Sequence, residues 1–270
     1  MPAESEEPRA NAGGGGRDGE TQIVLRECTT IDEFDACVRL QREAFGLPDL
    51  ELSPRRHLIV SRAAGGWVLG AFAAEGEMVG FVLNLAAARG DEPVGYSHMM
   101  AVAPAYQNRG VGARLKWAQR ERALAEGRRF IKWTWDPMQA RNAHFNINRL
   151  GAVVRAYAAN FYGTDYNMTP GEHGREYGID SDRLFAEWEL NSPRVEALAR
   201  GEAPAPPGDA AASVEIPPDW GALLREDPPR ARREQLRVRD EFQRAFAQGL
   251  VCAGFERDTT RPRYLFYCHA

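Results

Sequence analysis

The stretch YSHMMAVAPAYQNRGVGARL, residues 96–115, is the part of this 270-residue chain that is most informative about its fold. A strand-like segment from Tyr96 to Ala103 leads through a turn with two glycines into a segment that has Val111 and Leu115 on one helical face. Glycines at 110 and 112 let the backbone approach a ligand because they carry no Cβ. The amides that open a helix have no acceptor within it, and the helix dipole favours an anion there. The stretch therefore predicts a strand, a phosphate-binding turn and a helix.

Two other glycine motifs are excluded by spacing. A Walker loop needs Gly-Lys-Ser/Thr, which is absent from the chain, and a dinucleotide fingerprint needs a third glycine where this chain has Leu115. The alternative is an ordinary strand-turn-helix whose glycines only shape the turn.

The elements around this stretch follow a mixed order. Strands are expected at residues 23–25, 67–74, 78–85, 96–103, 130–135, 153–157 and 184–190, and the second and third form a hairpin. Helices are expected after a capping box at Thr30 and Glu33, from Val111 to a stop at Gly127, and over 139–150. This order predicts an α/β (α+β) fold with a mixed sheet.

Composition divides the chain into four parts. Residues 1–20 are expected to be a disordered tail, 21–200 a domain, 201–213 a Pro/Ala-rich linker, and 214–270 an extension. The extension is expected to contain a strand at 214–216, a helix at 229–248 and strands at 250–255 and 264–268. Its length, about 57 residues, is near the lower limit for an independent core. We therefore expect it to pack on the main domain or on a partner subunit.

Charge and composition exclude several classes of protein. A net charge of −4 gives no basic footprint for nucleic acid, and no apolar run is long enough to span a membrane. The four cysteines form no CxxC pair, which argues against a zinc site or a disulfide framework, and no metal is expected. The first twenty residues have no apolar core of a secretory signal, so the default location is the cytoplasm.

The motif Gln107-x-x-Gly110-x-Gly112, in this setting of strand, hairpin and helix, resembles the GCN5-related N-acetyltransferase (GNAT) superfamily over residues 21 to about 190. Residues 96–102, 133–137, 142–146, 160–163 and 181–184 look like one bacterial subfamily of acetyltransferases, some of whose members are similar to enzymes thought to N-succinylate amino acids. The resemblance implies a central, mostly antiparallel sheet that is splayed between its fourth and fifth strands and flanked by helices.

The resemblance also implies a reaction. Acyl-CoA, with acetyl-CoA as the default donor and succinyl-CoA as the rival, lies in the splay, and an amine attacks its thioester directly. The implied CoA contacts are Met100, Ala101, Val102, Gln107, Asn108, Arg109, Gly110, Val111, Gly112, Ala113 and Asn142. For Asn142, helix capping is the alternative.

Three side chains are candidates for proton transfer. His98 is the natural base if the face of the strand that it shares with Tyr96 and Met100 looks into the cleft; otherwise it is a core histidine. Tyr96 is a poor base because its ordinary pKa is about 10, and it is expected to orient a water. Many GNAT enzymes have a tyrosine that acts as the general acid at the position where this chain has Ile147. Tyr162 is therefore the substitute candidate for the general acid. The alternative is that Tyr162 is a half-buried aromatic residue with a structural role.

Four residues are candidates for binding the substrate. Asp136 is placed to bind an ammonium group, although Asp-Pro is also a common turn. Arg141 and Arg183 are candidates for gripping a carboxylate by two hydrogen bonds. Trp135, with Trp133, is expected to wall the acyl pocket or to belong to the core.

These observations predict an N-acyltransferase that acts on the amine of a small metabolite such as an amino acid. A CoA-binding or assembly module without turnover is the alternative from another class, motivated by Ile147. Acetylation of protein lysines is a weaker possibility. The final apolar runs also predict a homodimer, because they could add strands to a neighbour's sheet.

Overall fold

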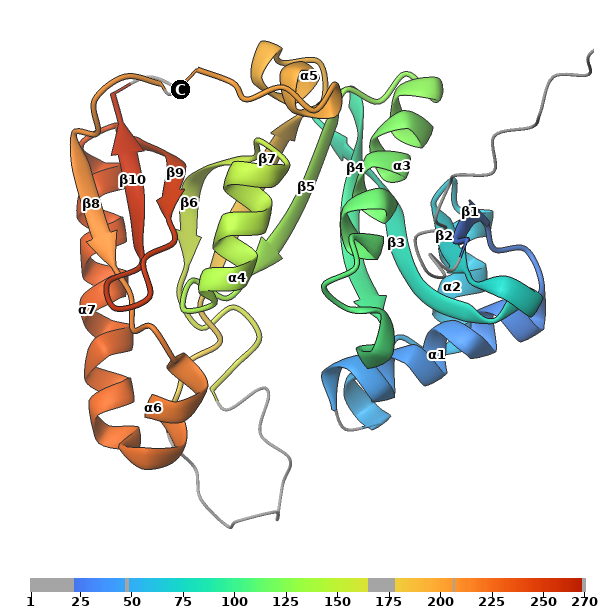
Figure 1. The fold of residues 1–270 in the computed structure, drawn as a ribbon, viewed down its shortest axis with the longest axis horizontal. Helices are drawn as coiled ribbons and strands as arrows, with labels where there is room; N and C mark the ends of the chain where they lie inside the picture. The colour runs from blue at the N-terminus through green and yellow to red at the C-terminus, as the bar shows by residue number, and fades with distance from the viewer. Residues whose placement is uncertain (1–21, 47–48, 165–177, 206, 269–270) are drawn as a thin grey trace, which may run out of the picture.

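A computed structural model describes residues 22–46, 49–164, 178–205 and 207–268. Within these ranges the strands form one ten-stranded sheet with the order β1-β2-β3-β4-β5-β7-β6-β9-β10-β8 (Figure 1). The strands are β1 (Val24–Glu27), β2 (Trp67–Phe72), β3 (Met78–Arg89), β4 (Glu92–Val102), β5 (Phe130–Trp135), β6 (Val153–Ala158), β7 (Arg183–Glu189), β8 (Ala212–Glu215), β9 (Val251–Glu256) and β10 (Arg263–Tyr267).

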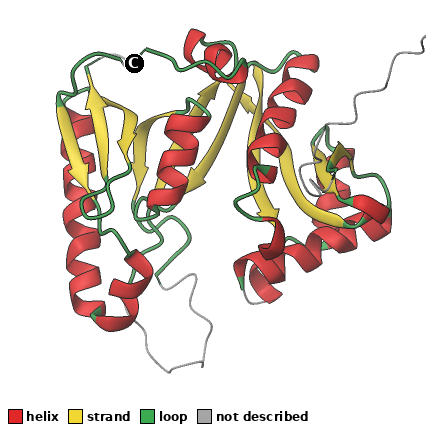
Figure 2. Ribbon diagram, in the orientation of Figure 1, coloured by secondary structure: helices red, strands yellow, loops and turns green. Residues whose placement is uncertain are grey.

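Helices cover both faces of this sheet (Figure 2). They are α1 (Ile31–Phe45), α2 (Arg55–Ala63), α3 (Val111–Ala125), α4 (Ala140–Ala143), α5 (Pro193–Ala199), α6 (Trp220–Glu226) and α7 (Pro228–Ala247), with short 3-10 turns at 49–51, 74–76 and 104–106. Helix α4 continues as a π-helix over His144–Arg149. In Figure 1, α3 and α4 lie in front of the strands, whereas α7 lies behind them.

The sheet is antiparallel except where β4 meets β5, so the predicted mixed, mostly antiparallel sheet is confirmed. A parallel pair needs a long crossover, and α3 supplies it between β4 and β5. Figure 1 shows these two strands meeting at one end and diverging toward the other, which is the predicted splay.

Local signals explain where the helices begin and end. At the start of α1, the Thr30 hydroxyl accepts from the Glu33 amide at 3.3 Å, and the Glu33 carboxylate accepts from the Thr30 amide at 3.0 Å. This capping box contributes about 1 kcal/mol to stability. Gly127 takes a positive φ of 76° just after α3, as its predicted role as a helix stop requires, and Gly151 takes a φ of 77° after the π-helix.

The C-terminal extension continues the sheet of the main domain. Strand β9 pairs with β6 at Val154 and Cys252, and β10 and β8 follow outside it. Val238 and Phe242 of α7 are fully buried in the same apolar core as Trp188 and Leu115. The expectation that the extension packs on the main domain is therefore confirmed.

Several segments differ from the sequence predictions. The sequence patterns do not predict helices α2, α5 and α6, because α2 has arginines at three of its nine positions and the other two helices have only seven residues each. Strand β8 begins at Ala212, inside the predicted linker, since the β10 ladder orders this segment. The predicted tail, residues 1–20, lies outside the described residues.

Candidate active site

The junction of β4 and β5 opens a cleft in the sheet. Only two residue pairs join the strands, Gly95 with Ile131 and Tyr96 with Lys132. Beyond Tyr96, β4 remains paired with β3 on one side but has left β5 on the other, so backbone groups on that side become available to a ligand. A cleft of about 520 Å³ lies there. Glycine is needed at 95, because a Cβ would come within 2.7 Å of Asn84 Oδ1 and 3.0 Å of Ile131 Cγ1.

A β-bulge at His98 sets which side chains face which side. Strand β3 pairs Leu83 with Met99 and Asn84 with Ser97, which leaves His98 as the extra residue. The prediction that Tyr96, His98 and Met100 share one face is therefore wrong for Met100. Met100 packs toward α3, where its Cε lies 3.5 Å from the position of a Cβ on Gly112, whereas His98 turns to the α2 side.

The glycine turn has the geometry that phosphate binding needs. Gly110 takes a φ of 79°, and nothing in the described chain lies within 4 Å of the position of a Cβ there. The amide of Arg114 donates to Gly110 O at 3.0 Å, so the amides of Val111, Gly112 and Ala113 precede the hydrogen-bond ladder of α3. Main-chain donors at a helix N-terminus suit an anion.

Side-chain contacts stabilise this turn and leave it open. Gln107 Nε2 donates to Val102 O at 3.1 Å, and Gln107 Oε1 accepts from Arg141 Nη1 at 3.4 Å. The Arg109 guanidinium lies 5.6 Å from the Tyr106 ring centroid. Asn108 has a φ of 61°, which an asparagine tolerates better than most residues. Arg141, predicted to grip the acceptor, therefore lies beside the phosphate turn instead.

His98 is exposed and lies beside α2. Its Nε2 is 3.2 Å from Ser53 Oγ, and its ring meets the ring of His57 edge-on at 5.5 Å between centroids. Desolvation, and to a lesser degree the charge of His57, lowers the pKa of His98 below its ordinary 6.5. A lower pKa keeps the imidazole neutral at pH 7, which is the form that accepts a proton. The alternative of a core histidine bonded to backbone does not describe this environment.

A second cluster lies across the cleft. The Tyr162 hydroxyl is 3.4 Å from Thr134 Oγ1, and the Arg183 guanidinium lies 5.0 Å from the Tyr162 ring centroid. Tyr96 shares hydrogen bonds with Thr134 and Tyr162, and burial is the main cause that raises its pKa above 10. Tyr96 therefore keeps its proton at neutral pH and is suited to donate it rather than to act as a base.

Asp136, at the end of β5, faces the same cleft. Its Oδ1 accepts from the Met138 amide at 2.9 Å and its Oδ2 from Gln139 Nε2 at 3.3 Å. Burial raises the pKa of Asp136 above 3.8, against the opposing effects of these bonds and of Arg183. The carboxylate therefore caps the Asp-Pro turn and also lines the cleft, and its binding of an ammonium group stays a prediction.

Sequence reasoning missed Lys116, one of only two lysines in the chain. Its ammonium group is fully buried on the cleft-facing side of α3, and it donates to Ser97 Oγ at 3.1 Å and to Gln119 Oε1 at 2.5 Å. It also lies 3.8 Å from the centre of the Trp133 ring. Desolvation lowers the pKa of Lys116 well below 10.5. A buried lysine on an arginine-rich helix gives no periodic signal that could have identified it.

The π-helix and β5 wall the cleft on the α4 side. Asn142 is exposed there, and Asn146 Oδ1 accepts from Trp133 Nε1 at 3.3 Å. Trp135 is buried and lines the cleft while its Nε1 donates to the Tyr264 hydroxyl at 3.3 Å, so it is both wall and core. Ile147 is fully buried and carries no titratable group, so the acid expected at that position in many GNAT enzymes is absent.

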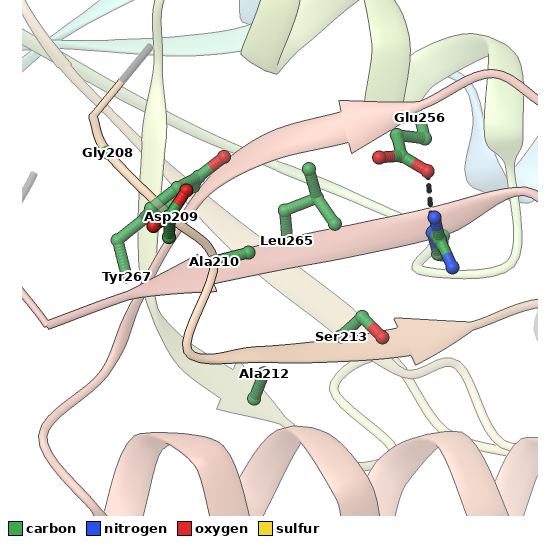
Figure 3. A pocket seen from close by; sticks show the side chains of 9 residues that line it. Gly208, Asp209, Ala210, Ala212, Ser213, Glu256, Leu265 and Tyr267 are labelled. Atoms are coloured by element: carbon green, nitrogen blue, oxygen red, sulfur yellow. Dashed lines mark hydrogen bonds and ion pairs between the residues drawn. The ribbon is translucent and has the colours of Figure 1, made fainter.

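A second hollow, of about 390 Å³, lies against β8, β9 and β10 (Figure 3). Two of its charged groups pair with each other, since Arg263 Nε is 2.6 Å from a Glu256 carboxylate oxygen. It lies at the far end of the sheet from the β4–β5 junction and contains no histidine or cysteine in its lining. The cleft at the junction is therefore the candidate active site.

Within the described ranges, the chain has neither a helix suited to span a membrane nor a cluster of metal-binding side chains. No helix there combines the length and apolar character that crossing a bilayer requires. No group of three or more histidine, cysteine or acidic side chains there is arranged to hold a metal ion. The expected absence of a metal stays a prediction.

Comparison with known proteins agrees with this geometry. Residues 34–151 match the Acetyltransferase (GNAT) family. These residues contain both the phosphate turn and the β4–β5 junction. The chain therefore has the GNAT acetyltransferase fold. The predicted fold and the predicted enzyme class, an acyltransferase, are therefore confirmed.

Solved structures share the fold at low sequence identity. A GNAT-family protein from Desulfovibrio desulfuricans aligns with a TM-score of 0.50 and 17% identity, over 63% of this chain and 99% of its own. The ribosomal-protein-S18-alanine N-acetyltransferase of Escherichia coli aligns with a TM-score of 0.50 and 15% identity, over 63% and 96%. An N-acetyltransferase of Staphylococcus aureus Mu50 aligns with a TM-score of 0.50 and 11% identity, over 63% and 100%. No curated protein matches the sequence.

Proposed function

We propose that this GNAT acyltransferase transfers an acyl group, acetyl by default, from acyl-CoA to the amine of a small metabolite such as an amino acid. The observation that carries the proposal is the junction itself. Strand β4 leaves β5 after Tyr96 beside the cleft, and the chain after β4 leads into the open glycine turn at the start of α3.

The donor side of the cleft is made mainly of main chain. Backbone groups of Met100, Ala101 and Val102 lie on the part of β4 that has left β5, so they are available to the amides of a pantetheine arm. The amides of 111–113 would bind the pyrophosphate. Asn142 is exposed at the edge of the cleft, where its amide can reach the same arm, and Arg141 supplies a positive charge near the turn.

The acceptor side is made of side chains. An amine must be unprotonated to attack a thioester, so a general base has to remove a proton from the substrate ammonium group. The departing CoA thiolate then has to receive a proton from a general acid. His98 is proposed as the base because it is exposed and largely neutral at pH 7. Tyr96 and Tyr162 are proposed as proton donors, since both line or adjoin the cleft as hydroxyls that share a hydrogen bond and Tyr96 is protonated at neutral pH.

The charges that line the cleft favour an amino acid as the acceptor. Asp136 can pair with the ammonium group of the substrate before that group loses its proton, and Arg183 can pair with a carboxylate. The two side chains lie close enough to influence each other, because Arg183 opposes the rise in the pKa of Asp136. A substrate that carries both charges would satisfy both.

A succinyl donor is the second candidate, and one observation favours it. Lys116 is a buried amine in the cleft lining with no carboxylate among its hydrogen-bond partners in the described chain. The terminal carboxylate of a succinyl group would give it a counter-ion, whereas an acetyl group would not.

Calorimetry with acetyl-CoA and succinyl-CoA tests the proposal directly. We expect micromolar binding of at least one donor and release of free thiol when amino acids are added. Failure of both donors to bind would overturn the proposal. Binding of CoA without thiol release from any amine would favour the non-catalytic CoA-binding module, and faster release with peptide amines would favour protein acetylation.

Oligomeric state and location remain predictions. The inner edge of the extension is already paired with β6, so an added strand from a second copy would have to pair with β8 at the outer edge. Light scattering of the full chain tests the predicted homodimer, and fractionation of cells tests the predicted cytoplasmic location.

A further inference from the structure

Helix α7 of the C-terminal extension is linked by hydrogen bonds and ion pairs to the segments that position Tyr162. Arg239 on α7 forms two hydrogen bonds with the Asp182 carboxylate, one from Nε at 2.9 Å and one from Nη2 at 2.7 Å. Asp182 is almost fully buried, and its Oδ1 also accepts from the Asn160 amide at 2.9 Å. The Tyr157 hydroxyl donates to its Oδ2. One carboxylate therefore joins α7, β6 and the loop that follows β6.

A second set of bonds fastens the same segment. Gln235 on α7 donates from Nε2 to Asp180 O at 2.6 Å and accepts from the Asp180 amide at 3.0 Å. The Asp180 carboxylate pairs with Arg232 at 2.8 Å and with Arg239 at 2.5 Å. It also accepts from the Thr164 hydroxyl at 3.0 Å, and the same two residues form an isolated β-bridge. Three side chains of one helix face thus fix residues 180–182.

Residues 180–182 in turn fix the loop that reaches the cleft. The Phe161 amide donates to Ser181 O at 3.0 Å, and the Tyr162 amide donates to Ser181 Oγ at 2.6 Å. Asn160 has a φ of 49°, a left-handed conformation that asparagine tolerates better than most residues and that turns the chain toward Phe161 and Tyr162. Arg183, which follows Asp182 directly, donates to Asp182 O at 2.8 Å and lines the cleft.

We propose that Arg239 is a positioning residue for the acceptor side of the active site: through Asp182 it sets the places of Tyr162 and Arg183. The assignment of an acceptor side rests on the proposed function, whereas the mechanical link does not. Neither Arg239 nor any other residue of α7 lines the cleft. The extension is therefore part of the catalytic unit although it lies outside the segment that matches the GNAT family.

Hydrogen exchange of the full-length protein tests the link without any substrate. In Arg239→Ala we expect the amides of Asn160, Phe161 and Tyr162 to exchange at least tenfold faster than in the wild type, because Asp182 loses the partner that holds it. Arg239→Lys keeps the positive charge but not the bidentate geometry, so it should give a smaller increase in the exchange rates of these amides.

Arg237→Ala is the matched control. Arg237 lies on the same helix and pairs with Glu234 at 2.8 Å and Glu241 at 3.0 Å, but it makes no bond to residues 180–182. We expect it to leave the exchange of the three amides within twofold of the wild type. Unchanged protection in folded Arg239→Ala, or equal loss in Arg237→Ala, would overturn the proposal. If Arg239→Ala does not fold, unchanged protection in Arg239→Lys does so instead.

Kinetics then separate this proposal from the proposed function. With a competent amine, Arg239→Ala should lose at least tenfold in kcat/KM for the acceptor, mainly through a higher KM, while the Kd for CoA stays within twofold. A loss of CoA affinity as large as the loss for the acceptor would contradict a role confined to the acceptor side. If the wild type transfers no acyl group, the proposed function fails, and hydrogen exchange still decides the link.

Discussion

The half of the sheet before the β4–β5 junction and the half after it give the cleft different kinds of group. The first half contributes main chain, namely the free side of β4 and the amides that open α3, together with His98 and Lys116. The second half contributes side chains from β5, from the π-helix and from the segment around β7.

This difference indicates how the acyl donor and the amine acceptor would each be recognised. A diphosphate can be held by amides, which every residue has, so glycines and a helix start are enough to define its site. An amine acceptor is recognised by specific side chains, and these are placed by contacts between residues far apart in sequence. Thr134 and Tyr162 meet across 28 residues, and Asp182 and Arg239 across 57.

The largest expected effect comes from the residue that takes the proton, which could belong to either half. We expect His98→Ala to lower kcat about 10²–10⁴-fold, and Asp136→Asn to lower it less than tenfold. Because the pKa of His98 lies below 6.5, activity of the wild type should be lost only as the pH falls below that value. The measurement is thiol release from pH 5 to pH 9, and a larger loss in Asp136→Asn would transfer the base to the second half.

The next effect concerns the main-chain site of the first half. Gly110→Asp places a negative side chain at the phosphate turn, and we expect the Kd for CoA to rise about 10–100-fold, or about 1.4–2.8 kcal/mol. Gly127→Asp is the control, because Gly127 has a φ of 76° against 79° for Gly110 and equally open surroundings at the other end of α3. Calorimetry that finds equal weakening in both variants would show that backbone strain, and not the anion site, is responsible.

A smaller effect is expected for the buried amine between the two halves. Since burial lowers the pKa of Lys116, the unfolded protein binds more protons than the folded one between that pKa and 10.5, and stability rises with pH there. Wild type should therefore gain stability over Lys116→Met as the pH rises from 7 to 10, by at most about 1.4 kcal/mol per pH unit. Urea unfolding measures this difference, and a difference that is constant with pH would show that Lys116 is not desolvated.

The smallest effect is expected at the outer edge of the second half. Arg263→Ala removes a surface ion pair from the second hollow, which should cost less than about 1 kcal/mol of unfolding free energy. Acyl transfer should be unchanged within twofold, because this hollow is remote from the junction. A tenfold loss of activity in Arg263→Ala would show that the hollow serves the reaction.

Local patterns in the sequence predicted most of the strands, and they predicted the phosphate turn. Alternation and glycine placement act over a few residues, so β2, β5 and α3 follow from the sequence almost as the structure has them. The same patterns failed at His98, because a bulge depends on how β3 pairs with β4 and not on β4 alone. Arg141 was misassigned for a related reason, since its partner Gln107 lies 34 residues away.

From the sequence alone follow most of the strands, helices α1 and α3 and the open glycine turn at the start of α3, because each of these depends on the backbone and on contacts between near neighbours. Only the tertiary structure decided that β9 continues the sheet, that Lys116 is buried in the cleft wall and that Arg239 holds the loop of Tyr162. Burial and charge pairing depend on which distant segments meet, and that is a property of the folded chain rather than of any stretch within it.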